Sequence, residues 1–136
     1  MKYLNYLEQI SALFRFKSIT DEHQNEYILF ENSALDTVRG IKDKTAFAAV
    51  ENHVHIVENI KKNEFEKLAL IGSSLGKAVL CSLKNRYPDK HFMVYVSLLL
   101  HDSMIIRFHQ KWENEQAYYD PAHFSGEDER VILFED

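Results

Sequence analysis

The sequence predicts an α+β domain: hairpins form an antiparallel sheet of about five to six strands, with an N-terminal helix and one long central helix packed on its apolar face. Three observations predict this class. Apolar residues recur at helical spacing over residues 63–87, whereas residues 92–100 and 104–111 alternate in the manner of paired strands. Only four glycines and two prolines occur among 136 residues, so we expect no long flexible linker and a single domain over residues 1–136.

The first third of the chain contains a predicted helix and a predicted strand. Residues 3–14 carry an apolar stripe with spacings of four, three and four residues, which indicates an amphipathic helix. The stripe consists of Tyr3, Leu7, Ile10 and Phe14. A short apolar run at residues 27–30 predicts a strand. Asn32 or Ser33 then caps a short predicted helix that continues to Ile41.

The middle of the chain predicts a hairpin followed by the long helix. Two apolar runs, at residues 45–50 and 53–57, flank a Glu-Asn pair, and asparagine tolerates the left-handed conformation of a tight turn. The long helix is expected to end before Pro88. Gly72 and Gly76 lie on one face of this helix and cost about 1 kcal/mol each relative to alanine. A close approach of the helix to the sheet would explain both glycines.

The hydrophobic pattern specifies a register for the strands at 92–100 and 104–111. With a three-residue loop at 101–103, one face pairs Leu100 with Met104, Leu98 with Ile106 and Val96 with Phe108. The other face pairs Leu99 with Ile105, Ser97 with Arg107 and Tyr95 with His109. A two-residue turn would place polar residues opposite core residues, so the pattern favours the longer loop. Residues 131–134 predict a short final strand.

The face that carries Tyr95, Arg107 and His109 is expected to lie opposite the long helix. Its polar residues suit a small anion site, and they equally suit the ordinary solvated side of an antiparallel sheet. Leu99 and Ile105 share this face. We therefore expect the face to be either solvated or covered by a second copy of the chain in a homodimer.

Charge is distributed unevenly along the chain. The formal net charge is −5, which argues against nucleic-acid binding because recognition of a phosphate backbone needs a basic surface. Residues 113–136 hold eight acids and one base, a local balance of −7, whereas residues 1–112 carry +2. This acidic C-terminal segment is either a solvated tail or a surface that steers a basic partner.

Aromatic residues accompany the acids in the C-terminal third, and interfaces combine aromatic anchors with steering charges. We therefore expect a small non-enzymatic protein-binding module, of the inhibitor or immunity type, that docks a basic partner through this surface. The candidate binding residues are Tyr95, Arg107, His109, Trp112, Glu113, Glu115, Tyr118, Tyr119, Glu127, Asp128 and Glu129.

An alternative function comes from the string Gly72-Ser73-Ser74-Leu75-Gly76, which fits G-x-S-x-G. It resembles the nucleophile elbow of the α/β-hydrolase family, which implies a strand at residues 67–71, a strained turn and a serine hydrolase. The resemblance covers about twenty residues and nominates Ser74, Asp102 (or Asp120) and His123 as catalytic residues. Helical spacing also continues through the string, so one unbroken helix over residues 67–77 would exclude the elbow geometry.

Other features bear on metals, cofactors and location. His53 and His55 point to one face of a strand and could bind a metal with further ligands, or they are polar residues on a solvated face. We expect no cofactor. The single cysteine, Cys81, rules out an internal disulfide and suits a reducing cytoplasm. No stretch approaches the roughly 18 apolar residues of a membrane span, so we expect no membrane partner.

Overall fold

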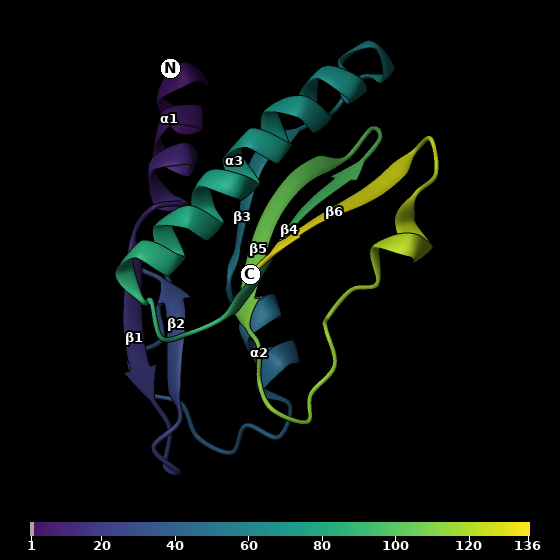
Figure 1. Cartoon of the computed structure of the whole chain (residues 1–136). Helices are drawn as coiled ribbons and strands as arrows, with labels where there is room; N and C mark the ends of the chain where they lie inside the picture. Colours follow the sequence, from purple (N-terminus) through teal and green to yellow (C-terminus); the bar gives the residue numbers. More distant parts are fainter. Residues whose placement is uncertain (1) are drawn as a thin grey trace.

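A computed structural model describes residues 2–136 as three α-helices and six strands in two antiparallel sheets (Figure 1). The elements are α1 (Lys2–Ala12), β1 (Phe16–Thr20), β2 (Glu26–Phe30), α2 (Lys44–Glu51), β3 (His53–Glu58), η1 (Lys62–Glu64), α3 (Phe65–Arg86), β4 (Phe92–Leu99), β5 (Ser103–Gln110), η2 (Pro121–Phe124) and β6 (Glu129–Glu135). The predicted α+β class, the N-terminal helix and the long helix on the sheet are confirmed. No helix within residues 2–136 has the length and hydropathy needed to cross a bilayer.

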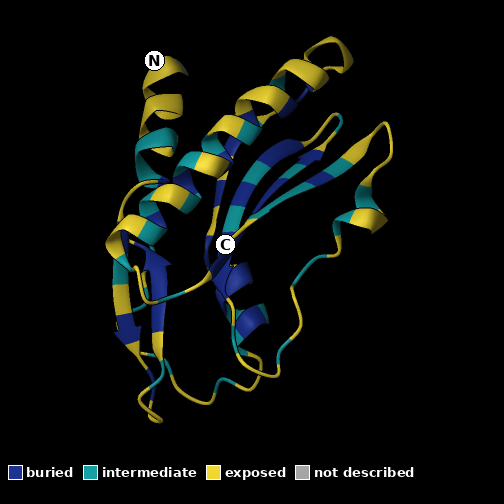
Figure 2. Cartoon of the chain, in the orientation of Figure 1, coloured by how far each residue is buried: buried dark blue, intermediate teal, exposed yellow. Residues whose placement is uncertain are grey.

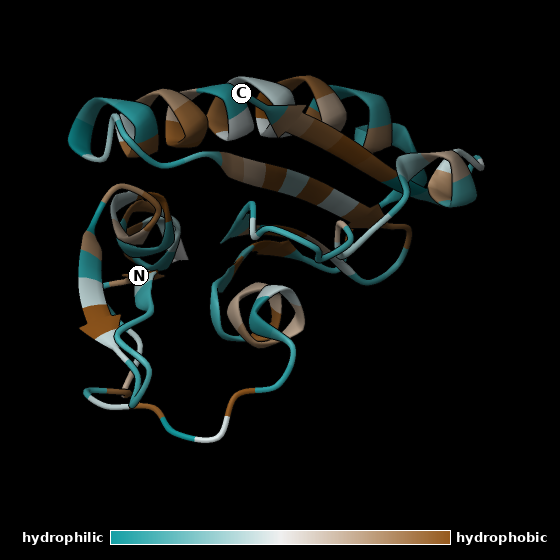
Figure 3. Cartoon of the chain, turned by 60° about the horizontal axis from the view of Figure 1, so that its bottom comes forward, coloured by the Kyte–Doolittle hydropathy of each residue, from teal (hydrophilic) through white to brown (hydrophobic). Residues whose placement is uncertain are grey.

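The larger sheet has four strands in the order β3-β5-β4-β6, and β1 pairs with β2 in a separate ribbon. Figure 3 shows α3 across one face of the larger sheet and α2 beneath the other. We call residues 111–128, which connect β5 to β6, the covering segment, because its aromatic side chains also pack on that second face. The main core lies between α3 and the sheet and extends to one face of the β1–β2 ribbon (Figure 2).

The two glycines of α3 allow the helix to approach the sheet closely, as predicted. A Cβ atom on Gly72 would lie 2.7 Å from Cγ1 of Val96 and 2.8 Å from Sδ of Met104. A Cβ atom on Gly76 would lie 2.8 Å from Cγ2 of Val96 and 2.9 Å from the ring of Phe134. Val96 therefore packs directly against the backbone of α3. Its side chain occupies the space that a Cβ atom at position 72 or 76 would need.

The prediction of a hairpin over residues 45–57 is wrong in its first half. Residues 44–51 form the helix α2, because the carboxylate of Asp43 caps its N-terminus by accepting a 2.9 Å hydrogen bond from the amide of Ala46. The second half, β3, is a strand as predicted, but it pairs with β5 instead of with residues 45–50.

The short helix predicted to end at Ile41 is also absent. Residues 32–43 form an irregular segment, in which Gly40 adopts a positive φ of 71°. Its apolar side chains pack on the outer face of the β1–β2 ribbon. They are Leu35, Val38 and Ile41. Strand β1 was not predicted, because its few apolar residues follow the apolar stripe of the preceding helix in the sequence without a break.

The register of the β4–β5 hairpin differs from the prediction by two residues. The loop consists of residues 100–102, so Leu98 pairs with Met104 and Val96 with Ile106. His101 adopts a left-handed φ of 65°, and its amide donates a 2.9 Å hydrogen bond to the carbonyl of Ile60, which holds the loop in place. A shift of two residues keeps every side chain on its expected face. The final strand, β6, is confirmed, and it pairs with β4.

Candidate functional site

The part of the face opposite α3 that carries Tyr95 and His109 is covered by the chain itself, which corrects the expectation that these residues are solvated or meet a second copy. Tyr95 and His109 are fully buried beneath α2 and the covering segment. The covering segment contributes Tyr118, Tyr119 and Phe124 to a small cluster with Tyr95. Neither Tyr95 nor His109 is therefore available to contact a partner at the surface. The long return of residues 111–128 gives no local signal that could have predicted this burial.

His109 has a structural role beneath the covering segment. Its Nδ1 lies 2.8 Å from the carbonyl oxygen of Gln110, an acceptor, so Nδ1 carries the proton. Nε2 then accepts a 2.9 Å hydrogen bond from the hydroxyl of Tyr95 and a 3.4 Å hydrogen bond from the amide of Tyr118. Burial lowers the pKa of His109, and the Gln110 carbonyl opposes this effect only in part. The imidazole is thus held in its neutral form.

Arg107 fixes the covering segment from the neighbouring sheet position. Its guanidinium lies 5.6 Å from the ring centre of Tyr118 and 5.5 Å from that of Tyr119. One terminal nitrogen donates a 3.0 Å hydrogen bond to the carbonyl of Ala49 in α2. Arg107 Nε and Ser97 Oγ are buried without a hydrogen-bond partner in the described part of the chain. Through these contacts Arg107 joins α2, the sheet and the covering segment.

Glu115 and Trp112 connect the covering segment to α2. The carboxylate of Glu115 accepts hydrogen bonds from the amide of Thr45 at 2.7 Å and from its hydroxyl at 2.6 Å. Burial would raise the pKa of Glu115, but the hydrogen bonds from Thr45 and Lys44 outweigh it and lower that pKa. Trp112 packs against Tyr27 and beneath the ammonium group of Lys44. These two predicted binding residues therefore stabilise the start of α2.

Asp120 caps η2 and lies near His123, and the other remaining acids of the C-terminal segment divide into two groups. Those at the very end pair with bases: Asp136 lies 2.7 Å from Lys84, and Glu135 lies 3.2 Å from Lys111. By contrast, four predicted binding residues are exposed and form no ion pair with the basic side chains described in residues 3–136. They are Glu113, Glu127, Asp128 and Glu129.

Two of these acids, Asp128 and Glu129, meet the β4–β5 hairpin at one end of the sheet, and Glu127 directly precedes them in the chain. The carbonyl of Asp128 accepts a 2.7 Å hydrogen bond from the amide of Leu100, and Glu129 pairs with Leu99 across the β4–β6 ladder. Asp102 is exposed in the same loop. We call this surface the acidic end and define it as Asp102, Glu127, Asp128 and Glu129. Leu99, an exposed aliphatic residue, lies beside it.

Arg130, the base nearest in sequence, is directed away from the acidic end. It is next to Glu129 in β6, so the two side chains point to opposite faces of the sheet. On the α3 side, its guanidinium forms a two-point contact with Glu66, with N–O distances of 2.7 and 3.1 Å. Arg130 therefore forms its ion pair with Glu66 and not with the acids beside it in the chain.

Ser74 does not lie in a nucleophile elbow. Residues 65–86 form one unbroken helix, so the predicted strand at 67–71 and the strained turn are absent. The Ser74 hydroxyl donates a 3.3 Å hydrogen bond to the carbonyl of Leu70 in the preceding helical turn. Of the other nominated residues, Asp102 lies in the β4–β5 loop, whereas Asp120 and His123 lie together at η2, with 3.7 Å between the Asp120 carboxylate and Nε2 of His123. None of them lies on α3, the helix that carries Ser74.

His53 and His55 lie exposed on β3 with ring centres 5.4 Å apart. Nδ1 of His53 is 2.6 Å from the carbonyl oxygen of Val50, and Nδ1 of His55 is 4.0 Å from the carboxylate of Glu58. Within the described residues, no set of three or more His, Cys, Asp and Glu side chains is arranged to hold a metal ion.

Of the predicted binding residues, Glu127, Asp128 and Glu129 are thus gathered at one end of the sheet, exposed and without an ion pair among the described residues, and Asp102 joins them there. Comparison of the chain with protein-family models, with curated proteins and with solved structures gave no match in any of the three. Function therefore has to be argued from this geometry alone.

Proposed function

We propose that this protein is a non-enzymatic binding module that docks a basic protein partner through the acidic end. The observation that supports this most is the contrast within one short stretch of chain. Glu127, Asp128 and Glu129 are exposed and form no ion pair within the described part of the chain, whereas Arg130 beside them is bound to Glu66. Unpaired carboxylates gathered at one surface repel each other and contribute little to folding, so a partner's positive charge gives them a role.

The surroundings of the acidic end also suit an interface. Leu99 supplies an apolar contact next to Glu129, and specific interfaces place such contacts inside a polar rim. Fixed negative charge raises the rate at which a basic partner associates and suppresses acidic competitors. An inhibitor or immunity-type role in the cytoplasm is consistent with this arrangement.

The test replaces three carboxylates at the acidic end with their amides: Glu127→Gln, Asp128→Asn and Glu129→Gln. The immobilised protein is exposed to a cell extract, and retained proteins are identified by mass spectrometry. We expect the unaltered protein to retain a basic partner and the triple variant to lose it. With the purified partner, the association rate at low salt should fall by about tenfold or more, and its dependence on salt should flatten.

A matched control changes the net charge equally at distant exposed acids: Glu31→Gln, Asp36→Asn and Asp89→Asn. The control should retain the partner with nearly unchanged kinetics. Both triple variants should unfold within about 0.5 kcal/mol of the unaltered protein, as surface substitutions usually do. The proposal fails if the acidic-end variant binds the partner as rapidly as the control does, or if that variant alone loses stability.

A further inference from the structure

Helix α1 leaves its apolar side chains in solvent. Tyr3, Leu4, Tyr6 and Leu7 are 57%, 46%, 46% and 57% exposed, and we call these four residues the α1 patch. Every residue from 3 to 9 is exposed, and burial begins only in the last turn (Figure 2). Monomeric domains rarely leave so many large apolar side chains together at the surface.

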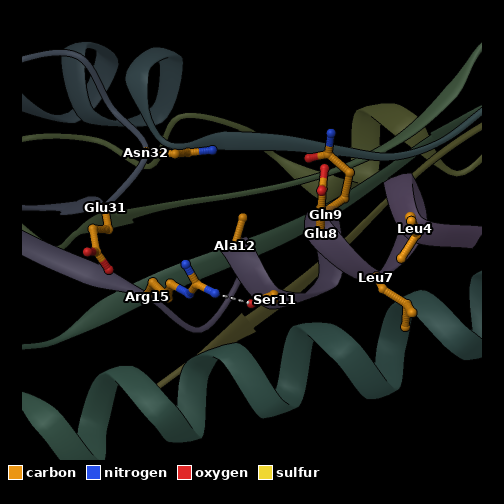
Figure 4. A pocket seen from close by; sticks show the side chains of 9 residues that line it. All are labelled: Leu4, Leu7, Glu8, Gln9, Ser11, Ala12, Arg15, Glu31 and Asn32. Atoms are coloured by element: carbon orange, nitrogen blue, oxygen red, sulfur yellow. Dashed lines mark hydrogen bonds between the residues drawn. The ribbon is translucent and has the colours of Figure 1, made fainter.

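The helix stands apart from its neighbours on two sides. A hollow of about 780 Å³ separates it from Glu31 and Asn32, which follow β2 (Figure 4). Leu4 and Leu7 point away from those residues and toward α3. Of the packed elements, only β3 contacts α1 extensively. Ile71 of α3 is also 45% exposed, so it adds to the uncovered apolar surface.

A helix of this length needs packing that one chain does not provide. Isolated helices shorter than about 12–15 residues are marginal in water, and α1 has 11. Its first turn carries no acid and its last turn no base, so charge does not offset the helix dipole. Burial of an amphipathic face is the remaining source of stability, and the apolar side chains of residues 3–7 are only about half buried.

The exposed area matches what a second copy of the chain would cover. The α1 patch and Ile71 together expose apolar surface of ~500 Å², taking roughly 200 Å² for each whole large side chain. Two copies would bury ~1,000 Å² of apolar surface, and interfaces are roughly 60% apolar. The whole interface would then reach ~1,700 Å², the standard size for a specific complex.

Charge on α1 disfavours a lipid surface and permits self-association. Membrane-surface helices carry lysine and arginine on their polar face, whereas here that face carries Asn5, Glu8, Gln9 and Ser11. The sequence of α1 contains one base, Lys2, and one acid, Glu8, so its net charge is zero and two copies of the patch meet with little like-charge repulsion. A two-fold arrangement also lets the same patch serve both partners.

We infer that the α1 patch binds a second copy of this chain, forming a two-fold dimer in which the two α1 helices pack against each other and against α3. This interface is remote from the acidic end in sequence and does not depend on the proposed function. It replaces the self-interface expected at Arg107 and His109, which the covering segment occupies.

The test measures mass in solution by sedimentation velocity between about 1 and 100 μM. The unaltered protein should sediment as two chains of 16.0 kDa at the upper concentrations. Leu4→Glu with Leu7→Glu should sediment as one chain, with the dissociation constant raised at least about 100-fold. A matched control, Val50→Glu with Leu99→Glu, adds the same charge at exposed apolar residues outside both α1 and α3 and should remain dimeric.

Amide hydrogen exchange distinguishes loss of the interface from misfolding. Protection of residues 3–10 should rise with concentration in the unaltered protein, while β4 and β5 stay equally protected in all variants. A milder variant, Leu4→Ser with Leu7→Ser, should also sediment as one chain. A single-chain mass for the unaltered protein at 100 μM overturns the inference, and co-sedimentation of that monomer with phosphatidylcholine vesicles would assign the patch to lipid. Persistence of the dimer in both α1 variants overturns it as well.

Discussion

At the scale of single residues, buried polar groups hold turns and segments together. Asp21, for example, organises the β1–β2 turn: its carboxylate accepts hydrogen bonds from the amides of His23 and Asn25 and from the hydroxyl of Tyr27. Burial would raise the pKa of Asp21, but these hydrogen bonds outweigh it and lower the pKa to about 2. His109 is the complementary case, a base kept neutral by burial.

These two residues predict losses of stability in separate pH ranges. Because burial lowers the pKa of His109 in the folded chain, the unfolded chain binds a proton first as the pH falls below about 6.5. The free energy of unfolding should therefore decline below that pH. Asp21, with a pKa lowered to about 2, adds a second decline as the pH falls below about 4.

The measurement is urea denaturation at pH values from 7.5 to 3. His109→Gln should remove the first decline and keep the second, while the exposed His123→Gln should keep both. If His109→Gln leaves the stability curve between pH 6.5 and 5 unchanged, titration of His109 is not the cause.

At the scale of elements, the sequence predicts those helices and strands whose buried residues recur with the period of the element itself. The long helix and the strands β4, β5 and β6 show their apolar stripes directly in the sequence. The prediction of a strand at residues 45–50 is wrong because their alanines and other apolar residues fit a strand and a helix equally well. The contacts that select the helix are the Asp43 cap and the hydrogen bonds to the distant Glu115. The run of acids at residues 127–129 could be predicted from the sequence. The position of Asp102 beside them and the burial of Tyr95 and His109 could not, because they depend on contacts between segments far apart in the chain.

The contact between α3 and the sheet predicts the effect of a substitution in the helix. Gly76→Ala gains about 1 kcal/mol of helix propensity, but its Cβ atom would lie 2.8 Å from Val96 and 2.9 Å from Phe134. Because Val96 is a fully buried β-branched residue, we expect a net loss of about 1–3 kcal/mol. Thermal unfolding measures it. Gly126→Ala, where a Cβ atom meets nothing closer than 3.8 Å, is the control. A stabilised Gly76→Ala variant would refute the close contact.

At the scale of the whole molecule, two side-chain amides join the two sheets. Strand β2 has no third strand beside it, and the side chains of Asn52 and Gln110 take that place. Asn52 accepts from the amide of Phe30 at 3.0 Å and donates to the carbonyl of Ile28 at 3.0 Å. Gln110 accepts from the amide of Ile28 at 2.8 Å and donates to the carbonyl of Glu26 at 3.0 Å. The side-chain amides of Asn52 and Gln110 therefore hold the ribbon beside the main sheet, and each can be removed by a single substitution.

Removing one of these amides should loosen the β1–β2 ribbon before the rest of the fold. Gln110→Met keeps the length of the side chain but leaves the Ile28 amide and the Glu26 carbonyl unpaired, at a cost of about 2–4 kcal/mol. Because this loss falls on the ribbon, amide hydrogen exchange should show protection of β1 and β2 reduced at least about tenfold more than that of β4 and β5. Gln116→Met, at an exposed position, should change neither. An equal loss of protection in all strands would mean that the ribbon and the sheet unfold as one unit, and the two amides would then not act as a separable joint.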